Sequence, residues 1–497
     1  MSRCCFAANL NPECGEKKTT MWQFEMNTNK GSDLRPFFDP CAVAVIGSLS
    51  EPMGSGYGAI KNMLQFGFKG RIYPINPSYS EVLGLRTYPG IDAVDATIDL
   101  AIVITPPETV PRITEQCAQK GVKAAIVISE GFAEASEEGG KLQQQIVDIA
   151  HHTGIRILGP NTIGVLNAAN GLITTPYFIG YERIQKGSIA YCSQTGLIGA
   201  RCQPLQHGAY PISKMCDLGN KCDVSEADLL NYLADDSETS VVAMHLEDVK
   251  EGRSFLDAAR RMLDLKPLLI LKTGRSEEGA RASASHTGSL RGNEQIYDAA
   301  FRQVGAIRIN TWREYWEIPK IFASQPLPLG NRIAIITFTA GAGIVAAAVA
   351  AEAGLTLADF SAPTVSRLTR LSPKLVGNPV DLGSLMAVSN DTFFFLQEAM
   401  AAVFADTNTD CVAIIFHGGN TIITSAVMDL LDQLRQHISK PVSIWIHGTD
   451  WLAGGDIARQ LEIRGLPAYF YLEIAIKALG IAAYYSQVRL SLDKKAV

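Results

Sequence analysis

Long apolar runs, a leader-like N-terminus and an excess of basic residues are all missing from this chain, and each absence excludes a class of protein. No apolar run reaches the ~18 residues that a membrane-spanning helix needs. The most apolar segment, IVAAAVAAEAGL from Ile344, is interrupted by Glu352 and Gly354, and a buried helix explains it. The N-terminus lacks the continuous apolar stretch of a secretory signal. The formal net charge of -6 disfavours nucleic acid as a partner, because such binding normally needs a basic face.

Several motifs of fixed spacing are absent as well. The 10 cysteines are scattered without a CxxC pair, so we expect neither a metal site nor a disulfide framework, but reduced thiols in the cytoplasm. The G-x-S-x-G turn of α/β hydrolases does not occur, which excludes that kind of serine nucleophile. No segment reads as an ATP-grasp domain.

Short apolar, β-branched runs separated by helix-length gaps recur along the chain, which is typical of parallel strands in an α/β fold. Residues 1–35 carry no such pattern, and we expect a disordered extension in which Met21 and Met26 are alternative starts. The runs fall into three blocks, 36–168, 186–325 and 330–490, with a linker around 171–187. The predicted strands are 42–47, 71–76, 99–105, 123–129 and 155–159 in the first block, 187–193, 240–247, 267–274 and 306–310 in the second, and 332–338, 410–419 and 441–448 in the third.

Unusual residues follow the predicted strands of the first block. A glycine-rich turn, beginning at Gly47 and Ser48, leads from the first strand into a helical pattern and offers N–H groups to a pyrophosphate, although a plain tight turn also fits. The second strand ends in Asn76 and Pro77, without the acidic residue that would bind the ribose of NAD. A nucleotide-containing ligand other than NAD is therefore favoured. Further strand ends supply Thr105 and Pro106 in TPPE, Ser129 and Glu130 in SEGF, and Asn161 in GPNTIG.

The second block offers an anion-binding turn and a strand-end carboxylate. SQTGLIG follows a strand directly, so Ser193, Thr195 and Gly196 form a phosphate cradle at a predicted helix N-terminus. Glu247 ends the strand in MHLEDVKEG, where it either holds an imidazole in one tautomer or simply faces water.

ARASASHTGSL, residues 280–290, surrounds a single histidine with small and hydroxyl-bearing residues. Most histidines are structural or solvated, but this loop lets main-chain N–H groups approach an anion closely. His286 has no further ligand beside it for a metal. We therefore interpret His286 as a residue that itself carries a group.

A set of motifs occurs along the chain in this order: VIGSLSEPMGSGYGAIKNM, INP, TPPE, ISEGF, GPNTIG, SQTG, LEDVKEGRSF, SHTGSL and GNPVDLG. Together they closely resemble the NDP-forming acyl-CoA synthetases, relatives of the succinyl-CoA synthetase α subunit. The resemblance covers roughly Phe37 to the C-terminus. It implies a Rossmann-like CoA-binding domain followed by two flavodoxin-like parallel-sheet domains, the last with TAGAG at 339–343. The residues expected to contact CoA are Gly47, Ser48, Asn76, Pro77, Thr105, Pro106, Ser129 and Glu130.

The resemblance also implies the chemistry. His286 matches the phosphorylated histidine, Glu247 the carboxylate that steadies it, and Ser193, Thr195 and Gly196 the loop that holds the phosphoryl group. Asn161 falls near the thiol and acyl end of CoA. An acid, CoA and ATP or GTP are interconverted with acyl-CoA, ADP or GDP, and phosphate, through an acyl phosphate and phosphohistidine.

Two residues depart from the family pattern, and one module is missing. Ser78 stands where a lysine often follows the second strand, and Thr162 replaces the cysteine of GPNCxG. The missing ATP-grasp module implies a β subunit that binds nucleotide and Mg2+, in an α2β2 assembly. The alternative readings are a CoA-binding regulatory protein of the same fold that lost the reaction, and an NAD-dependent Rossmann enzyme, which the missing ribose carboxylate disfavours.

Overall fold

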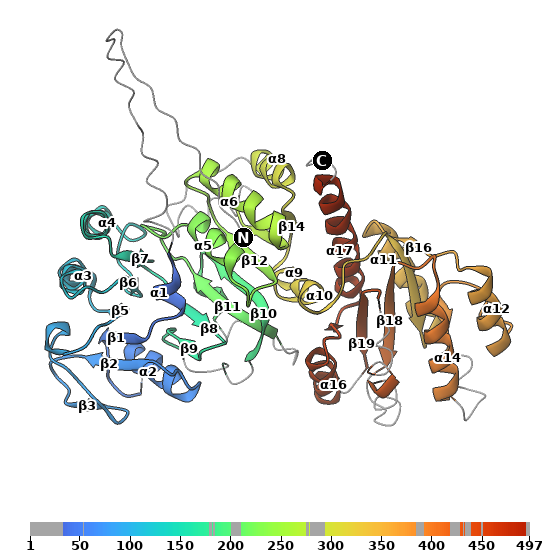
Figure 1. The fold of residues 1–497 in the computed structure, drawn as a ribbon, viewed down its shortest axis with the longest axis horizontal. Coiled ribbons are helices and arrows are strands. Elements are labelled where there is room, and N and C mark those ends of the chain that lie inside the picture. Colours follow the sequence, from blue (N-terminus) through green and yellow to red (C-terminus); the bar gives the residue numbers. More distant parts are fainter. Residues whose placement is uncertain are drawn as a thin grey trace, which may run out of the picture. The chain divides into compact units, whose positions relative to one another are not determined.

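Three parallel sheets follow one another along the chain in the computed structural model (Figure 1). The first sheet contains β1 (Ala42–Gly47), β2 (Arg71–Ile75), β5 (Leu100–Ile104), β6 (Ala124–Val127) and β7 (Arg156–Leu158), in the order β2-β1-β5-β6-β7. The structure describes residues 33–52, 54–177, 181, 184–199, 210–274, 278, 294–383, 392–417, 428–430, 432, 439–448 and 451–493. The expected disordered extension, 1–35, lies almost wholly outside these residues.

Helices and short elements complete the first block. Helix α2 packs on β1 and β5, while α3 and α4 pack against each other and on β5, β6 and β7 (Figure 1). Ser136 caps α4 through its hydroxyl, and the left-handed Gly154 ends it. The elements are α1 (Arg35–Phe38), α2 (Ser55–Gln65), the hairpin β3 (Glu81–Val82) and β4 (Leu85–Arg86), η1 (Ile91–Ala93), η2 (Pro107–Thr109), α3 (Val110–Gln119) and α4 (Glu137–Thr153).

The second sheet has the order β14-β13-β12-β10-β11-β8-β9, and its two last strands pair antiparallel. Its strands are β8 (Val165–Asn167), β9 (Leu172–Ile173), β10 (Ile184–Ser193), β11 (Tyr210–Asp217), β12 (Val241–Leu246), β13 (Leu268–Lys272) and β14 (Ile307–Ile309). Its helices are η4 (Gly196–Ile198), α5 (Glu226–Asp235), α6 (Gly252–Leu265), α8 (Glu294–Val304), α9 (Trp312–Glu317) and α10 (Pro319–Ser324).

The third sheet has the order β16-β15-β18-β19-β20, and β17 pairs with β15. Its strands are β15 (Arg332–Thr337), β16 (Thr356–Leu357), β17 (Val380–Asp381), β18 (Cys411–His417), β19 (Val442–His447) and β20 (Ala468–Tyr469). Its helices are α11 (Ala340–Glu352), α12 (Ala362–Leu371), α14 (Thr392–Ala405), α16 (Trp451–Ile463) and α17 (Leu472–Asp493). In the parallel part of each sheet, one strand (β1, β10 and β15 in turn) lies between the next parallel strand along the chain and a later one, which makes it the point where the winding direction changes.

Every strand predicted from an apolar run is present, and the α/β fold class is confirmed. The predicted linker, 171–187, is not a plain connection, because its residues include β9 and the start of β10. Strand β8, which was assigned to the first block, pairs with β11 of the second sheet. Strand β11 was not predicted, because Lys214 interrupts its apolar pattern; Lys214 is buried against Asp236 and Glu238.

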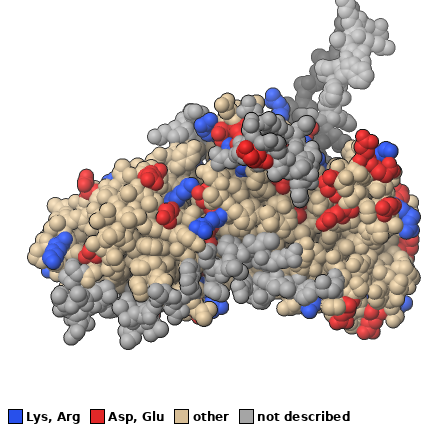
Figure 2. Space-filling view, turned by 180° about the vertical axis from the view of Figure 1, so that it is seen from behind, with Lys and Arg blue, Asp and Glu red and all other residues tan. Residues whose placement is uncertain are grey.

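Helix α11 forms where the most apolar segment predicted it, but the prediction that it is buried is partly wrong. Gly343, Ala346 and Ala350 face the core, whereas Ile344 and Val345 are 69% and 51% exposed. A helix lying on a sheet buries only one stripe of its surface. No helix in the described part of the chain has the length and hydropathy to cross a membrane. On the face drawn in Figure 2, acidic and basic side chains are interspersed.

The second and third blocks are joined by a buried charge cluster. Lys320 on α10 lies 2.5 Å from Glu317 and 2.7 Å from Glu462 of α16, and the three side chains are 2%, 6% and 4% exposed. Tyr210 donates a hydrogen bond to Glu317, and Lys320 also donates to the carbonyl of Ala468. Although burial alone would lower the pKa of Lys320, the two carboxylates raise it. The ammonium group therefore stays charged between them.

Replacing this lysine by an uncharged side chain of similar size tests the cluster. Lys320→Met leaves two buried carboxylates without their cation, so we expect the free energy of unfolding to fall by about 3–5 kcal/mol. Urea unfolding followed by tryptophan fluorescence measures it. Lys123→Met is the control, because Lys123 is 62% exposed in its pair with Asp99 and such pairs contribute about 0–1 kcal/mol. Equal losses in the two variants would contradict the role of the cluster.

Candidate functional site

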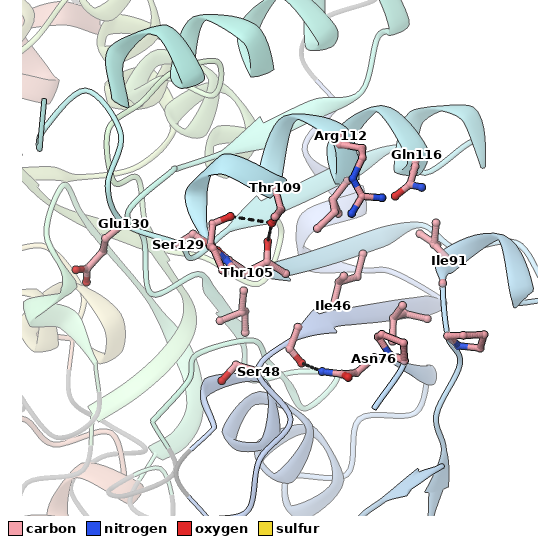
Figure 3. A pocket seen from close by; sticks show the side chains of 18 residues that line it. Ile46, Ser48, Asn76, Ile91, Thr105, Thr109, Arg112, Gln116, Ser129 and Glu130 are labelled. Carbon is pink, nitrogen blue, oxygen red and sulfur yellow. Dashed lines mark hydrogen bonds between the residues drawn. The ribbon is translucent and has the colours of Figure 1, made fainter. Parts of the chain in front are cut away.

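A cavity of about 770 Å³ opens at the carboxyl ends of β1, β2, β5 and β6, where ligands bind in open parallel sheets (Figure 3). All the residues expected to contact CoA line it, namely Gly47, Ser48, Asn76, Pro77, Thr105, Pro106, Ser129 and Glu130. These residues come from four strand ends far apart in the sequence. The tertiary fold thus brings them to one wall.

Gly47 shapes the turn after β1. Its φ is +111°, and a Cβ there would lie 2.0 Å from the carbonyl oxygen of Ile104, so no other residue fits. The N–H of Ser48 donates to that same carbonyl, at 3.1 Å. The side chain of Asn76 donates to the carbonyl of Gly47, at 3.3 Å (Figure 3). The turn is therefore held against β5 on one side and the end of β2 on the other.

Hydroxyl groups tie the ends of β5 and β6 together. Ser129 donates to the carbonyl of Thr105 at 2.6 Å and accepts from the N–H of Thr105 at 3.1 Å. Thr109 donates to the hydroxyl of Thr105, at 2.9 Å (Figure 3). The Ser129 hydroxyl is engaged with the backbone, so it builds the wall of the cavity.

A second cavity, of about 480 Å³, lies between the first and second blocks. It shares Ile104, Ser129 and Glu130 with the first cavity, so the two are contiguous. Of the predicted residues of the second site, Asn161, Thr195, Gly196 and Glu247 line it. This arrangement suits a long ligand that binds in the first block and extends its reactive end toward the second.

The loop of GPNTIG forms part of the second cavity. Asn161 has a φ of +58°, and its N–H donates to the carbonyl of Ser129 at 3.0 Å. Thr162, which replaces the family's cysteine, donates to the carbonyl of Asp217 at 2.5 Å and accepts from the N–H of Gly164 at 2.9 Å. Its hydroxyl thus joins the loop to the end of β11.

Asp217, which sequence reasoning missed, anchors this loop. Its carboxylate accepts the N–H of Ile163 at 2.8 Å and the N–H of Gly219 at 3.2 Å. Burial, with a smaller contribution from the charge of Glu247, raises the pKa of Asp217 to about 7. In the sequence, Asp217 could have been noticed as a charged residue that ends a buried run, directly before the LGN motif.

Ser193 lies beneath the anion-binding turn. It is fully buried, is not among the lining residues of the second cavity, and accepts the N–H of Thr195 at 3.0 Å. Its hydroxyl is 3.0 Å from Nδ1 of His245, whose Nε2 is 3.2 Å from the hydroxyl of Thr273. Burial and then Lys272 lower the pKa of His245 to about 4, so the imidazole is neutral at pH 7. After Thr195 the structure describes a 3-10 turn, η4, and residues 200–209, into which the predicted helix would continue, lie outside the described residues.

Glu247 is positioned by Gln194, another residue that the sequence did not single out. The side-chain oxygen of Gln194 accepts the N–H groups of Glu247 and Asp248, at 2.9 and 3.1 Å. Its nitrogen donates to Asp248 at 2.6 Å, and the buried Lys221 also donates to Asp248, at 2.7 Å. The turn that carries Glu247 is thereby held to the turn that carries Thr195.

Carboxylates outnumber cations in the second cavity, where Lys250 is the one cation among the lining residues that the structure describes. Burial alone would raise the pKa values of Glu134 and Asp248, but their contacts outweigh it. Hydrogen bonds from Asn220 and the backbone lower the pKa of Glu134. Lys221 and Gln194 lower the pKa of Asp248. Near neutral pH Asp217 is partly protonated, whereas Glu134 and Asp248 keep their negative charge.

His286 lies outside the described residues. The segment that contains it begins at Thr273, whose N–H donates to the carbonyl of Leu246 at 3.0 Å, and it returns at α8. Leu246 precedes Glu247, so this segment leaves the second sheet beside the predicted carboxylate.

The chain is similar to known proteins over most of its length. Residues 42–168 match the family model of a CoA binding domain, and residues 186–322 match that of the succinyl-CoA ligase like flavodoxin domain. The chain is 36% identical over 464 residues to acetate–CoA ligase [ADP-forming] II of Archaeoglobus fulgidus, which covers 92% of this chain and 68% of that protein. It is 32% identical to acetate–CoA ligase [ADP-forming] I subunit alpha of Pyrococcus furiosus, over 93% of this chain and 100% of that subunit.

A solved structure is similar over nearly the same range. The dinucleotide-forming acetyl-coenzyme A synthetase 1 of Ca. Korarchaeum cryptofilum, in complex with phosphate and ADP, superposes with a TM-score of 0.84 at 29% identity. The match covers 94% of this chain and 99% of that one.

The raised pKa of Asp217 predicts a pH-dependent stability. The native carboxyl holds its proton up to pH about 7, whereas the unfolded one loses it above pH about 4. The stability from this proton is present below pH about 4 and lost as the pH rises toward 7. Relative to Asp217→Asn, the wild-type free energy of unfolding should fall by about 1.4 kcal/mol per pH unit between pH 5 and 7, then level off. Urea titrations across this range measure the difference, and parallel curves would contradict it.

Proposed function

Since this chain belongs to the family of the ADP-forming acyl-CoA synthetases, we propose that it is the α-type half of an NDP-forming acyl-CoA synthetase. It interconverts a carboxylic acid, CoA and ATP with acyl-CoA, ADP and phosphate. One observation carries the proposal: the cavity lined by the expected CoA-contacting residues shares Ser129 and Glu130 with the cavity that Glu247 lines, so the two cavities adjoin. CoA bound in the first therefore presents its thiol end in the second.

The reaction runs through two phosphoryl carriers. A phosphate oxygen attacks the thioester carbonyl, the C–S bond breaks, and the CoA thiolate takes up a proton. A ring nitrogen of His286 then attacks the phosphorus of the acyl phosphate, and the free carboxylate leaves. A neutral imidazole suits this step because it attacks at neutral pH and later leaves as a nitrogen leaving group.

The described residues divide this work between them. Glu247 accepts a hydrogen bond from the other ring nitrogen of His286 and stabilises the positive charge that phosphorylation creates. Thr195 and Gly196 line the second cavity, where a small residue permits close approach of an anion. Protonated Asp217 and the ammonium of Lys250 reduce the repulsion that the other carboxylates exert on phosphate.

The nucleotide and Mg2+ belong to a partner in this proposal. The chain spans the whole of a relative that is named as a subunit alpha, but 68% of a relative in which the ligase is one chain. We infer an ATP-grasp β subunit, in an α2β2 assembly, that takes the phosphoryl group from His286 to ADP or GDP. A cytoplasmic location is part of the same proposal.

Phosphoryl transfer to His286 is the direct test. Incubation of the chain with its partner subunit, Mg2+ and γ-labelled ATP should label it with an acid-labile, base-stable phosphate. His286→Ala should remain unlabelled, whereas His152→Ala, which changes an exposed histidine on α4, should be labelled like the wild type. Equal labelling of His286→Ala would disprove the phosphohistidine, and a wild type that binds CoA but is never labelled would favour the regulatory protein.

The hydrogen bonds of Gln194 predict a split between turnover and binding. Gln194→Ala removes the acceptor for the N–H groups of Glu247 and Asp248, so kcat should fall about 10- to 100-fold through misplacement of Glu247. The KM for CoA should stay within about twofold, since the first cavity is unchanged. Steady-state kinetics with Gln144→Ala as the control measures both, because Gln144 is an exposed glutamine of α4. A raised KM with an unchanged kcat would show the opposite division of roles.

A further inference from the structure

The first cavity has side chains of opposite charge at its two ends. Among its lining residues, the charged side chains are Arg112 and Glu130. Figure 3 shows Arg112 beside Gln116 on α3, facing Ile91 and Asn76, with Glu130 at the other end of the cavity. Glu130 also lines the second cavity, so the end with the arginine is the one away from the proposed reaction.

Arg112 is free to bind a ligand. It is exposed at the mouth of the cavity, and no hydrogen bond or ion pair holds it among the residues that the structure describes. A guanidinium group presents a planar fork of donors that matches two oxygens of a phosphate, and it stays charged at every physiological pH. No other cation lines this cavity within the described range.

The shape of CoA decides which group meets the arginine. CoA has its thiol at one end and its phosphates at the other, so a thiol beside Glu130 directs the nucleotide half toward Arg112. Gly47, with its positive φ, brings backbone without a side chain to the wall of the cavity, where a diphosphate can approach closely. The apolar side chains of Ile91 and Ile113 line the cavity near Arg112 and suit the adenine ring.

We propose that Arg112 binds the 3′-phosphate of CoA and thereby selects CoA over 3′-dephospho-CoA and fixes its direction in the cavity. This inference rests on the proposed function, because it takes CoA as the ligand. Gln116, one helical turn further along α3, adds a neutral donor on the same side. Arg112 is a binding residue in this proposal and takes no part in the chemical steps.

Calorimetric titration of the full chain with CoA and with 3′-dephospho-CoA tests the proposal. Arg112→Ala should weaken CoA binding by roughly 10- to 100-fold, the effect of losing a hydrogen-bonded charge pair, and change dephospho-CoA binding by less than about twofold. Arg112→Lys should recover part of the loss, because it restores the charge without the fork. Arg86→Ala is the control: Arg86 is an exposed arginine of the same block that does not line the cavity.

Each outcome has a definite meaning. Loss of affinity for CoA alone supports the proposal. Equal weakening of both ligands in Arg112→Ala, or no weakening of either, overturns the assignment of the 3′-phosphate while CoA binding by the wild type leaves the proposed function standing. If the wild type binds neither ligand, the proposed function fails together with this inference.

Discussion

The hydrogen bonds that Asp217 accepts from Ile163 and Gly219 hold together the junction on which the rest of the site depends. Asp217 ends β11 in the second sheet, and Ile163 belongs to the loop that leaves the first sheet. A single carboxylate therefore fixes the loop of Asn161 to the floor of the second cavity. Asn161 in turn bonds to the carbonyl of Ser129, which lines both cavities, so the junction also sets how the two cavities meet.

A second layer of contacts sets the geometry of the proposed phosphoryl site. Gln194 joins the turn after β10 to the turn after β12, and Lys221 holds Asp248 from below. His245, neutral and buried, spans the ends of β10 and β13 through Ser193 and Thr273. Gln194 and Asp248 line the second cavity, whereas Lys221, Ser193 and His245 lie behind its lining residues. The residues exposed to the ligand thus depend on buried polar groups that are each satisfied by a neighbour, as buried polar groups must be.

Because the strand order repeats, the first and second blocks each provide one crevice for a part of the ligand. The three sheets change winding direction at β1, β10 and β15, and the strand ends beside each of these strands form a crevice. In the first block this crevice is the cavity of Gly47 and Asn76, and in the second it holds Thr195 and Glu247. The opposite charges at the two ends of the first cavity then orient a long anion within it. In the proposed function, chemistry between two domains is possible because the two crevices adjoin at Ser129 and Glu130.

The sequence by itself determined the strands marked by apolar runs, the fold class and eight of the 18 residues that line the first cavity. Runs such as those of β1 and β5 are buried on both faces, and this leaves a continuous apolar signal that needs no tertiary information. Strand ends marked by Gly47, Asn76 or Ser129 were recognisable for the same reason, since parallel strands end at one edge. Only the tertiary structure decided the roles of Asp217, Gln194, His245 and Arg112. Each acts on groups contributed by distant parts of the chain, and spacing in a sequence carries no record of which strand ends meet in space.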